Sequence, residues 1–241
     1  MDSSPSSPKE TSTLEALRDL IHKRISTFAY LQRVHNGGAH YFNTILLSEE
    51  DLSRFYNNKR LRKRSQKIFI LGTSLGPILE ITTTPDYVKA LHQIIHEYEH
   101  FVSDGSKTKK RNFFRKSKFT GEQVFFNTNF QETGEYIHLD VRTTPFEPDY
   151  LQILHTFCDI MVVVYTKLME GIPEFYRSPL AEVVSKIDTK FKKILAVINR
   201  DLDLVVHTLI CRELEKMDPL PSPKNGTNAA EDWEAMNALH I

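Results

Sequence analysis

Cysteine is scarce in this 241-residue sequence, which has only two, and tryptophan occurs once. Cys158 and Cys211 both fall within apolar patterns of helical spacing, where a free thiol behaves as a small hydrophobic side chain. Two such residues provide no disulfide framework of the kind that stabilises small secreted domains. We therefore expect a reducing compartment, the cytosol or the nucleus, and a hydrophobic core that needs neither disulfides nor metals.

Long hydrophobic runs and an excess of charge of one sign are also missing. The most apolar stretch, residues 157–168, includes Asp159 and Lys167 and is much shorter than the about 20 apolar residues that span a bilayer, so we expect no transmembrane segment. Residues 1–9 are rich in Ser and Pro without an apolar run, so we expect no secretory signal. Lys plus Arg and Asp plus Glu each number 31, which argues against nucleic acid as the main partner and leaves only local electrostatic sites.

The motifs of common enzyme classes are absent as well. The sequence has no glycine-rich phosphate loop, no G-x-S-x-G turn, no paired C-x-x-C and no kinase motif set. No catalytic constellation is complete, and apolar seams of helical spacing dominate the chain. We therefore expect a non-enzymatic adaptor or scaffold that binds other proteins, without a cofactor.

Apolar residues at steps of three and four are what the sequence has in abundance, and they predict helices. The clearest seam is that of Tyr150, Leu154, Phe157, Met161, Val164 and Leu168. We predict a mainly α-helical protein, an up-and-down bundle of about five helices over residues 13–218. A disordered tail is expected at residues 1–12 and a flexible tail at residues 219–241.

Local signals predict where these helices begin and end. Helices are expected over residues 13–35, from 48 to about 71 with a break near 57–58, over 84–104, from 149 to about 170, and over 179–216. Glycine and proline at Gly72 and Gly76-Pro77 should disrupt the second of these. A basic mobile loop is expected at 106–121. Residues 122–147 then predict a small β-hairpin, with strands at 124–130 and 136–141, or else an extended strap before the fourth long helix.

One enzymatic motif occurs in the third predicted helix. Residues 96–100 read His-Glu-Tyr-Glu-His, an HExxH sequence in which His96 and His100 would bind zinc and Glu97 would activate a water molecule. A zinc-dependent hydrolase is thus an alternative function. The positions that would complete a longer zinc motif are Ser103 and Ser106, and His92 extends the histidine row instead. This pattern is equally typical of a solvated helix flank.

A basic and aromatic segment at residues 107–119 supplies a further alternative. It combines seven basic residues with three phenylalanines, and its binding residues would be Lys107, Lys109, Lys110, Arg111, Phe113, Phe114, Arg115, Lys116, Lys118 and Phe119. This composition suits reversible binding to an anionic membrane surface or another anionic ligand. It also suits calmodulin, a nucleic-acid backbone, nuclear import or a hydrated loop. A second basic run, residues 59–64, is typical of a solvated helix face.

The two tails carry weaker signals. Ser4-Pro5, Ser7-Pro8 and Ser222-Pro223 are candidate sites of proline-directed phosphorylation, which would make this a phosphoprotein. Near the C-terminus, Trp233, Met236 and Leu239 recur at steps of three in a polar, acidic context, a pattern typical of a short helix that docks into a partner's groove. Docking of this segment back onto its own bundle fits equally well.

Overall fold

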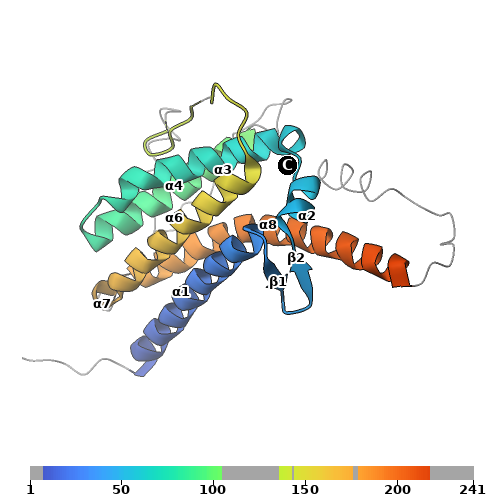
Figure 1. The fold of residues 1–241 in the computed structure, drawn as a ribbon. Coiled ribbons are helices and arrows are strands. Elements are labelled where there is room, and N and C mark those ends of the chain that lie inside the picture. The colour runs from blue at the N-terminus through green and yellow to red at the C-terminus, as the bar shows by residue number, and fades with distance from the viewer. Residues whose placement is uncertain (1–7, 105–135, 143, 176–178, 218–241) are drawn as a thin grey trace, which may run out of the picture.

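The structure is a computed structural model, and it describes residues 8–104, 136–142, 144–175 and 179–217. Within these residues, five long helices form a bundle, as the sequence predicts. They are α1 (Pro8–His35), α3 (Asn58–Leu79), α4 (Thr84–Asp104), α6 (Tyr150–Glu170) and α8 (Leu180–Met217). Around the bundle the packed pairs are α1 with α6, α6 with α3, α3 with α4, and α4 with α8 (Figure 1). The mainly α-helical class is confirmed.

Helix α6 is the central element, packed between α1 and α3. All six residues of its predicted seam are buried, and the ring of Phe157 meets that of Phe28 from α1 edge to face, with centroids 6.3 Å apart. In length and composition, α6 is also the one helix of the described residues that is apolar enough to cross a membrane. A core helix of a bundle has the same properties, and α6 occupies that place here.

The helix starts follow from identifiable caps. Ser48 precedes α2 (Glu49–Phe55) and its hydroxyl accepts from the Asp51 amide, which satisfies one of the free N–H groups of the first turn. Asn57 caps α3 in the same way, so the predicted break near 57–58 is confirmed. Asp149 caps α6. Helix α1 begins at Pro8, so residues 8–12 are helical rather than part of the expected tail; a proline is tolerated in a first helical turn.

The predicted disruption of α3 by glycine and proline is wrong, because the helix continues to Leu79. Gly72 lies against α6, where a Cβ atom would meet Ile160 at 3.6 Å and Phe157 at 3.8 Å, so a small residue permits close packing. Pro77 falls in the last turn of the helix. The amide that a proline lacks disrupts only one hydrogen bond there, and the bundle supplies the packing that holds the turn.

A two-stranded antiparallel hairpin is present, but between α1 and α2 rather than before α6. It pairs β1 (Ala39–Tyr41) with β2 (Ile45–Leu47). The described part of the predicted hairpin, residues 136–142, has no strand and lies over the bundle as the alternative strap. Residues 105–135, with the expected loop and first strand, lie outside the described residues.

Helix α8 has 38 residues and is the longest helix that the structure describes, as its apolar seam predicts. A short helix that the sequence did not predict, α7 (Ile172–Phe175), precedes it. The last turns of α8 extend beyond the bundle, past the hairpin and α2 (Figure 1). All side chains from Ile210 to Met217 are exposed there, including that of Cys211, which was expected to lie in an apolar face.

Candidate protein-binding surface

The HExxH sequence lies in α4, but its glutamate has a structural role. The Glu97 side chain is fully buried, and its oxygens accept from the amides of Ile137 at 3.0 Å, His138 at 3.0 Å and Leu139 at 2.8 Å. Gln93 donates a further hydrogen bond at 2.8 Å. The carboxylate therefore anchors the strap to the bundle, and neither oxygen is left to accept a proton from a water molecule.

The histidine row lies along the contact between α4 and α8, so it is half-buried rather than a solvated flank. Burial is the main cause that lowers the pKa of His92 to about 4, and charge repulsion from Lys190, His96 and Lys186 contributes to the same shift. The pKa of His96 is lowered for the same reasons. Neighbouring lysines oppose a metal cation as they oppose a proton. In the part of the chain that the structure describes, no three His, Cys, Asp or Glu side chains converge as metal ligands.

Other predicted binding residues fall outside the described residues, namely the basic and aromatic segment 107–119 and the C-terminal Trp233, Met236 and Leu239. The basic run 59–64 is described, at the N-terminal end of α3. Arg64 does not belong to a solvated face, because it forms an ion pair with Asp201, which is buried in α8. Asp203, two residues further along α8, accepts instead from the Tyr41 hydroxyl of the hairpin.

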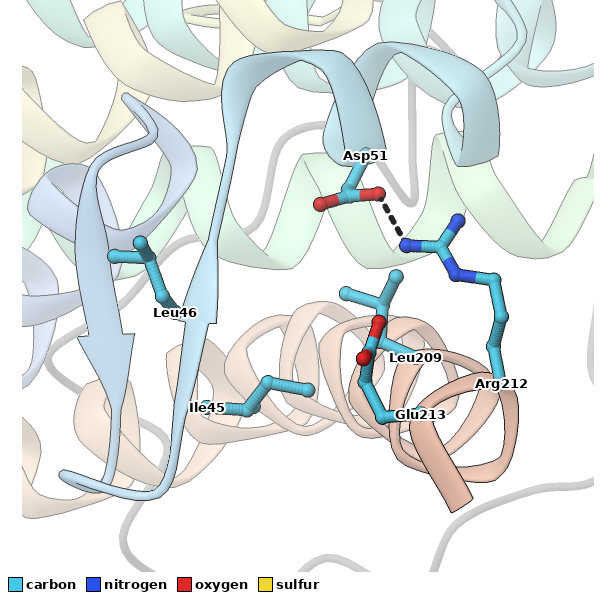
Figure 2. A pocket seen from close by; sticks show the side chains of 6 residues that line it. All are labelled: Ile45, Leu46, Asp51, Leu209, Arg212 and Glu213. Atoms are coloured by element: carbon cyan, nitrogen blue, oxygen red, sulfur yellow. Dashed lines mark hydrogen bonds and ion pairs between the residues drawn. The ribbon is translucent and has the colours of Figure 1, made fainter. Parts of the chain in front are cut away.

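A groove opens where the hairpin meets the C-terminal part of α8. Its walls are Ile45 and Leu46 of β2, Asp51 of α2, and Leu209, Arg212 and Glu213 of α8. Figure 2 shows Ile45 extending from the hairpin towards Leu209 of the helix. On the far side, Arg212 donates to Asp51 at 2.9 Å and ties α8 to α2. The Ser48 hydroxyl and Arg212 hold the pKa of Asp51 below its ordinary value, so this ion pair is formed at neutral pH.

An exposed apolar stripe continues this groove along α8. Ile210, Leu214 and Met217 follow at steps of four and three, so they share one side of the helix. Asp203, seven residues before Ile210, lies on that same side and bonds to Tyr41 of the hairpin. The stripe therefore lies on the hairpin side of α8, beyond the point where the hairpin covers it. Leu214 is 58% exposed and Met217 82% exposed.

The tip of the hairpin adds an exposed aromatic side chain in a strained backbone conformation. Phe42 is 70% exposed with a φ of 43°, and Asn43 follows with 56°. Turns of this kind favour glycine or asparagine, and a bulky residue at positive φ is uncommon. Two neighbours hold Phe42 in this conformation. Its ring centroid lies 4.6 Å from that of Tyr41 and 5.6 Å from that of Tyr30, and its amide donates to the Tyr30 hydroxyl at 3.0 Å.

We define the hairpin–α8 surface as this groove together with the exposed apolar side chains of the hairpin tip and of the end of α8: Phe42, Ile45, Leu46, Asp51, Leu209, Ile210, Arg212, Glu213, Leu214 and Met217. The groove holds about 230 Å³, less than the about 300–1,000 Å³ of most small-molecule sites. It is therefore suited to one or two side chains of a protein partner. Sequence reasoning missed this surface, although Ile210, Leu214 and Met217 lie off the buried seam of α8, which was a usable signal.

No protein-family model, no curated protein and no solved structure matches this chain. The chemistry of the surface is therefore the ground on which a function can be inferred.

Proposed function

We propose that this protein is a helical adaptor that binds another protein through the hairpin–α8 surface. The observation that carries the proposal is the gathering of exposed apolar side chains there. Of the ten large hydrophobic residues that are exposed within the described part of the chain, five belong to this surface: Phe42, Leu46, Ile210, Leu214 and Met217. Contiguous exposed apolar side chains are typical of surfaces that bind protein partners.

The chemistry of the groove supports a protein rather than a small-molecule ligand. A few large side chains supply most of the binding energy at protein interfaces, and the residues around them mainly exclude water. Phe42 offers a large aromatic side chain for such a contact. The ion pair of Asp51 and Arg212 forms a polar border. The strained backbone at Phe42 is consistent with a side chain retained for contact, because strain of this kind persists where surrounding structure enforces it.

Affinity capture with matched variants tests the proposal. The variant Leu214→Asp places a charge in the stripe, and Val163→Asp places one on α6, which contributes no residue to the surface and where Val163 is 51% exposed. We expect the wild-type protein and Val163→Asp to capture the same partners, and Leu214→Asp to lose those that use this surface. Retention of every partner by Leu214→Asp and by Phe42→Gly would refute the proposed function.

A second candidate function is binding of an anionic surface at the end of the bundle where α3 begins and α4 ends. One structural observation favours it. Burial raises the pKa of the Tyr98 hydroxyl, and the nearby charge of Arg64 partly opposes that rise, which places the N-terminal part of α3 beside the C-terminal part of α4. The exposed Lys59, Arg62 and Lys63 therefore lie at the end of the bundle from which residues 105–135 continue. Salt-sensitive sedimentation with anionic liposomes, lost on deletion of residues 107–119, would support this function; no sedimentation would exclude it.

A further inference from the structure

We propose that the hairpin–α8 surface is occupied by the protein's own C-terminal segment, with Trp233, Met236 and Leu239 as its anchors, until a partner displaces it. The inference rests on the proposed function, because it names what competes for the same surface. The docked segment would then regulate the access of a partner to this surface.

The position of the chain end makes this occupant available. Helix α8 ends at Met217, and the groove residue Leu209 lies eight residues earlier, about 12 Å back along the axis at 1.5 Å per residue. Residues 218–232 separate the helix from Trp233 and can span at most about 50 Å. The segment therefore reaches the whole surface, provided the chain reverses direction. Pro219, Pro221 and Pro223 follow α8 and are incompatible with its continuation.

The chemistry of the segment matches that of the surface. Trp233, Met236 and Leu239 recur at steps of three, a spacing that would put them on one side of a helix. The groove offers Ile45, Leu46 and Leu209 with room for one or two such side chains. The stripe of Ile210, Leu214 and Met217 offers further apolar contact on the same side of α8. No other part of the sequence beyond the described residues combines tryptophan with apolar anchors next to this helix.

Tethering makes even weak docking sufficient. A linker of this length gives the segment an effective concentration of the order of 1 mM at the surface. An intrinsic dissociation constant of about 0.1 mM would then keep roughly nine-tenths of the molecules closed. A partner that binds only the open form would have its apparent affinity reduced about tenfold, which is the regulatory consequence.

The single tryptophan provides a direct test in the full-length protein, because Trp233 is the only source of indole fluorescence. We expect a blue-shifted emission and an acrylamide quenching constant several-fold lower than in urea. Leu214→Asp and Leu46→Asp should shift the emission to the red and raise the quenching constant. Val163→Asp, with the same 51% exposure as Leu46, should change neither quantity.

Each other outcome overturns the inference. A tryptophan that is fully accessible to acrylamide in the wild-type protein would show that the segment does not dock. Protection that survives both surface variants would place the segment elsewhere, and protection that disappears on dilution would show docking onto a second copy. A fourth variant separates this inference from the proposed function. Met236→Asp should release the segment and raise the apparent affinity for a captured partner about tenfold. Unchanged capture that still requires Leu214 would leave the proposed function standing and remove the regulation.

Discussion

Glu97 belongs to a sequence motif of zinc enzymes, but in this fold its side chain has a structural role. Its two oxygens accept four hydrogen bonds, three of them from consecutive amides of the strap. An amide side chain at this position would keep one acceptor oxygen and turn an N–H group towards backbone donors. Buried donors that lose their acceptor cost about 1–3 kcal/mol each.

We therefore expect Glu97→Gln to lower the free energy of unfolding by about 2–4 kcal/mol and to release the strap. Urea denaturation measures the first effect, and hydrogen exchange at the amides of residues 137–139 measures the second. Glu99→Gln is the matched control, since Glu99 pairs with Lys190 and Lys193 at the edge of α4 and its loss should cost less than about 1 kcal/mol. Unchanged exchange of the strap amides in Glu97→Gln would contradict the structural role.

His92 predicts a pH dependence of stability. Its pKa falls from about 6.5 in the unfolded chain to about 4 in the folded protein, so the unfolded state binds the proton more readily. Both states are neutral at high pH, and stability is lost as the pH falls from about 6.5 towards 4. The full shift corresponds to about 3 kcal/mol, but the side chain is half-buried and solvent screens its neighbours, so we expect roughly 1–2 kcal/mol.

The comparison of wild type with His92→Gln isolates this contribution. Urea denaturation of both proteins between pH 7.5 and about pH 4.5 should show a difference in stability that grows as the pH falls, with the variant losing less. Lys186, Lys190, His96 and Glu99 face His92, and they are the same in both proteins. Parallel curves for the two proteins would show that folding does not lower the pKa of His92.

At the scale of single elements, α3 contains two glycines that its helical conformation does not require. A Cβ atom at Gly76 meets nothing within 4 Å, and one at Gly72 makes only ordinary contacts with α6. Alanine is favoured over glycine within a helix by about 1 kcal/mol. Gly76→Ala should therefore raise the free energy of unfolding by about 0.5–1 kcal/mol, as measured by urea denaturation. Gly72→Leu should lower it instead, because its branched side chain would push α3 away from α6.

The elements also show which parts of the fold the sequence could predict. Helices α6 and α8 were predicted correctly because each buries one continuous apolar side, and that periodicity is local information. The hairpin at 39–47 was missed because its strands have three residues each and its turn, Phe42-Asn43, lacks the usual glycine. Residues 136–141 have β-branched and aromatic side chains, yet the amides of residues 137–139 bond to Glu97 and no strand forms.

Long-range partners explain the rest of what sequence reasoning missed. Arg64 belongs to a basic run that resembles a solvated face, but its partner Asp201 lies 137 positions later and is buried. The walls of the groove come from residues 45–51 and 209–213, which share no local pattern. Periodicity identifies the buried side of a helix but does not show which charged residue turns inward, because that depends on the helix packed against it.

At the scale of the whole molecule, two buried carboxylates determine the register of α8 against the neighbouring helices. Asp188 accepts from Arg24 of α1 at 2.6 Å and 3.0 Å and from the Tyr165 hydroxyl of α6 at 2.9 Å. Thirteen residues later, Asp201 pairs with Arg64 of α3. Apolar side chains on a long helix can slide past one another at small cost, whereas these two carboxylates satisfy their hydrogen bonds only in one register.

A double-mutant cycle on Arg24 and Asp188 tests this last point. Arg24→Leu leaves a buried carboxylate with only Tyr165 as partner, so we expect a loss of about 3–5 kcal/mol in the free energy of unfolding. The double variant Arg24→Leu with Asp188→Leu removes both charges and should recover most of that loss. Arg54→Ala, which breaks the exposed pair with Glu50, is the control and should cost less than about 1 kcal/mol. Equal stability of the double variant and Arg24→Leu would show that the two residues act independently. A stable double variant in which α8 shifts register, seen as loss of the protection of Trp233 or of partner capture, would show that the ion pair serves specificity more than stability. Asp188 and Asp201 are the residues that tie α8 to α1, α6 and α3.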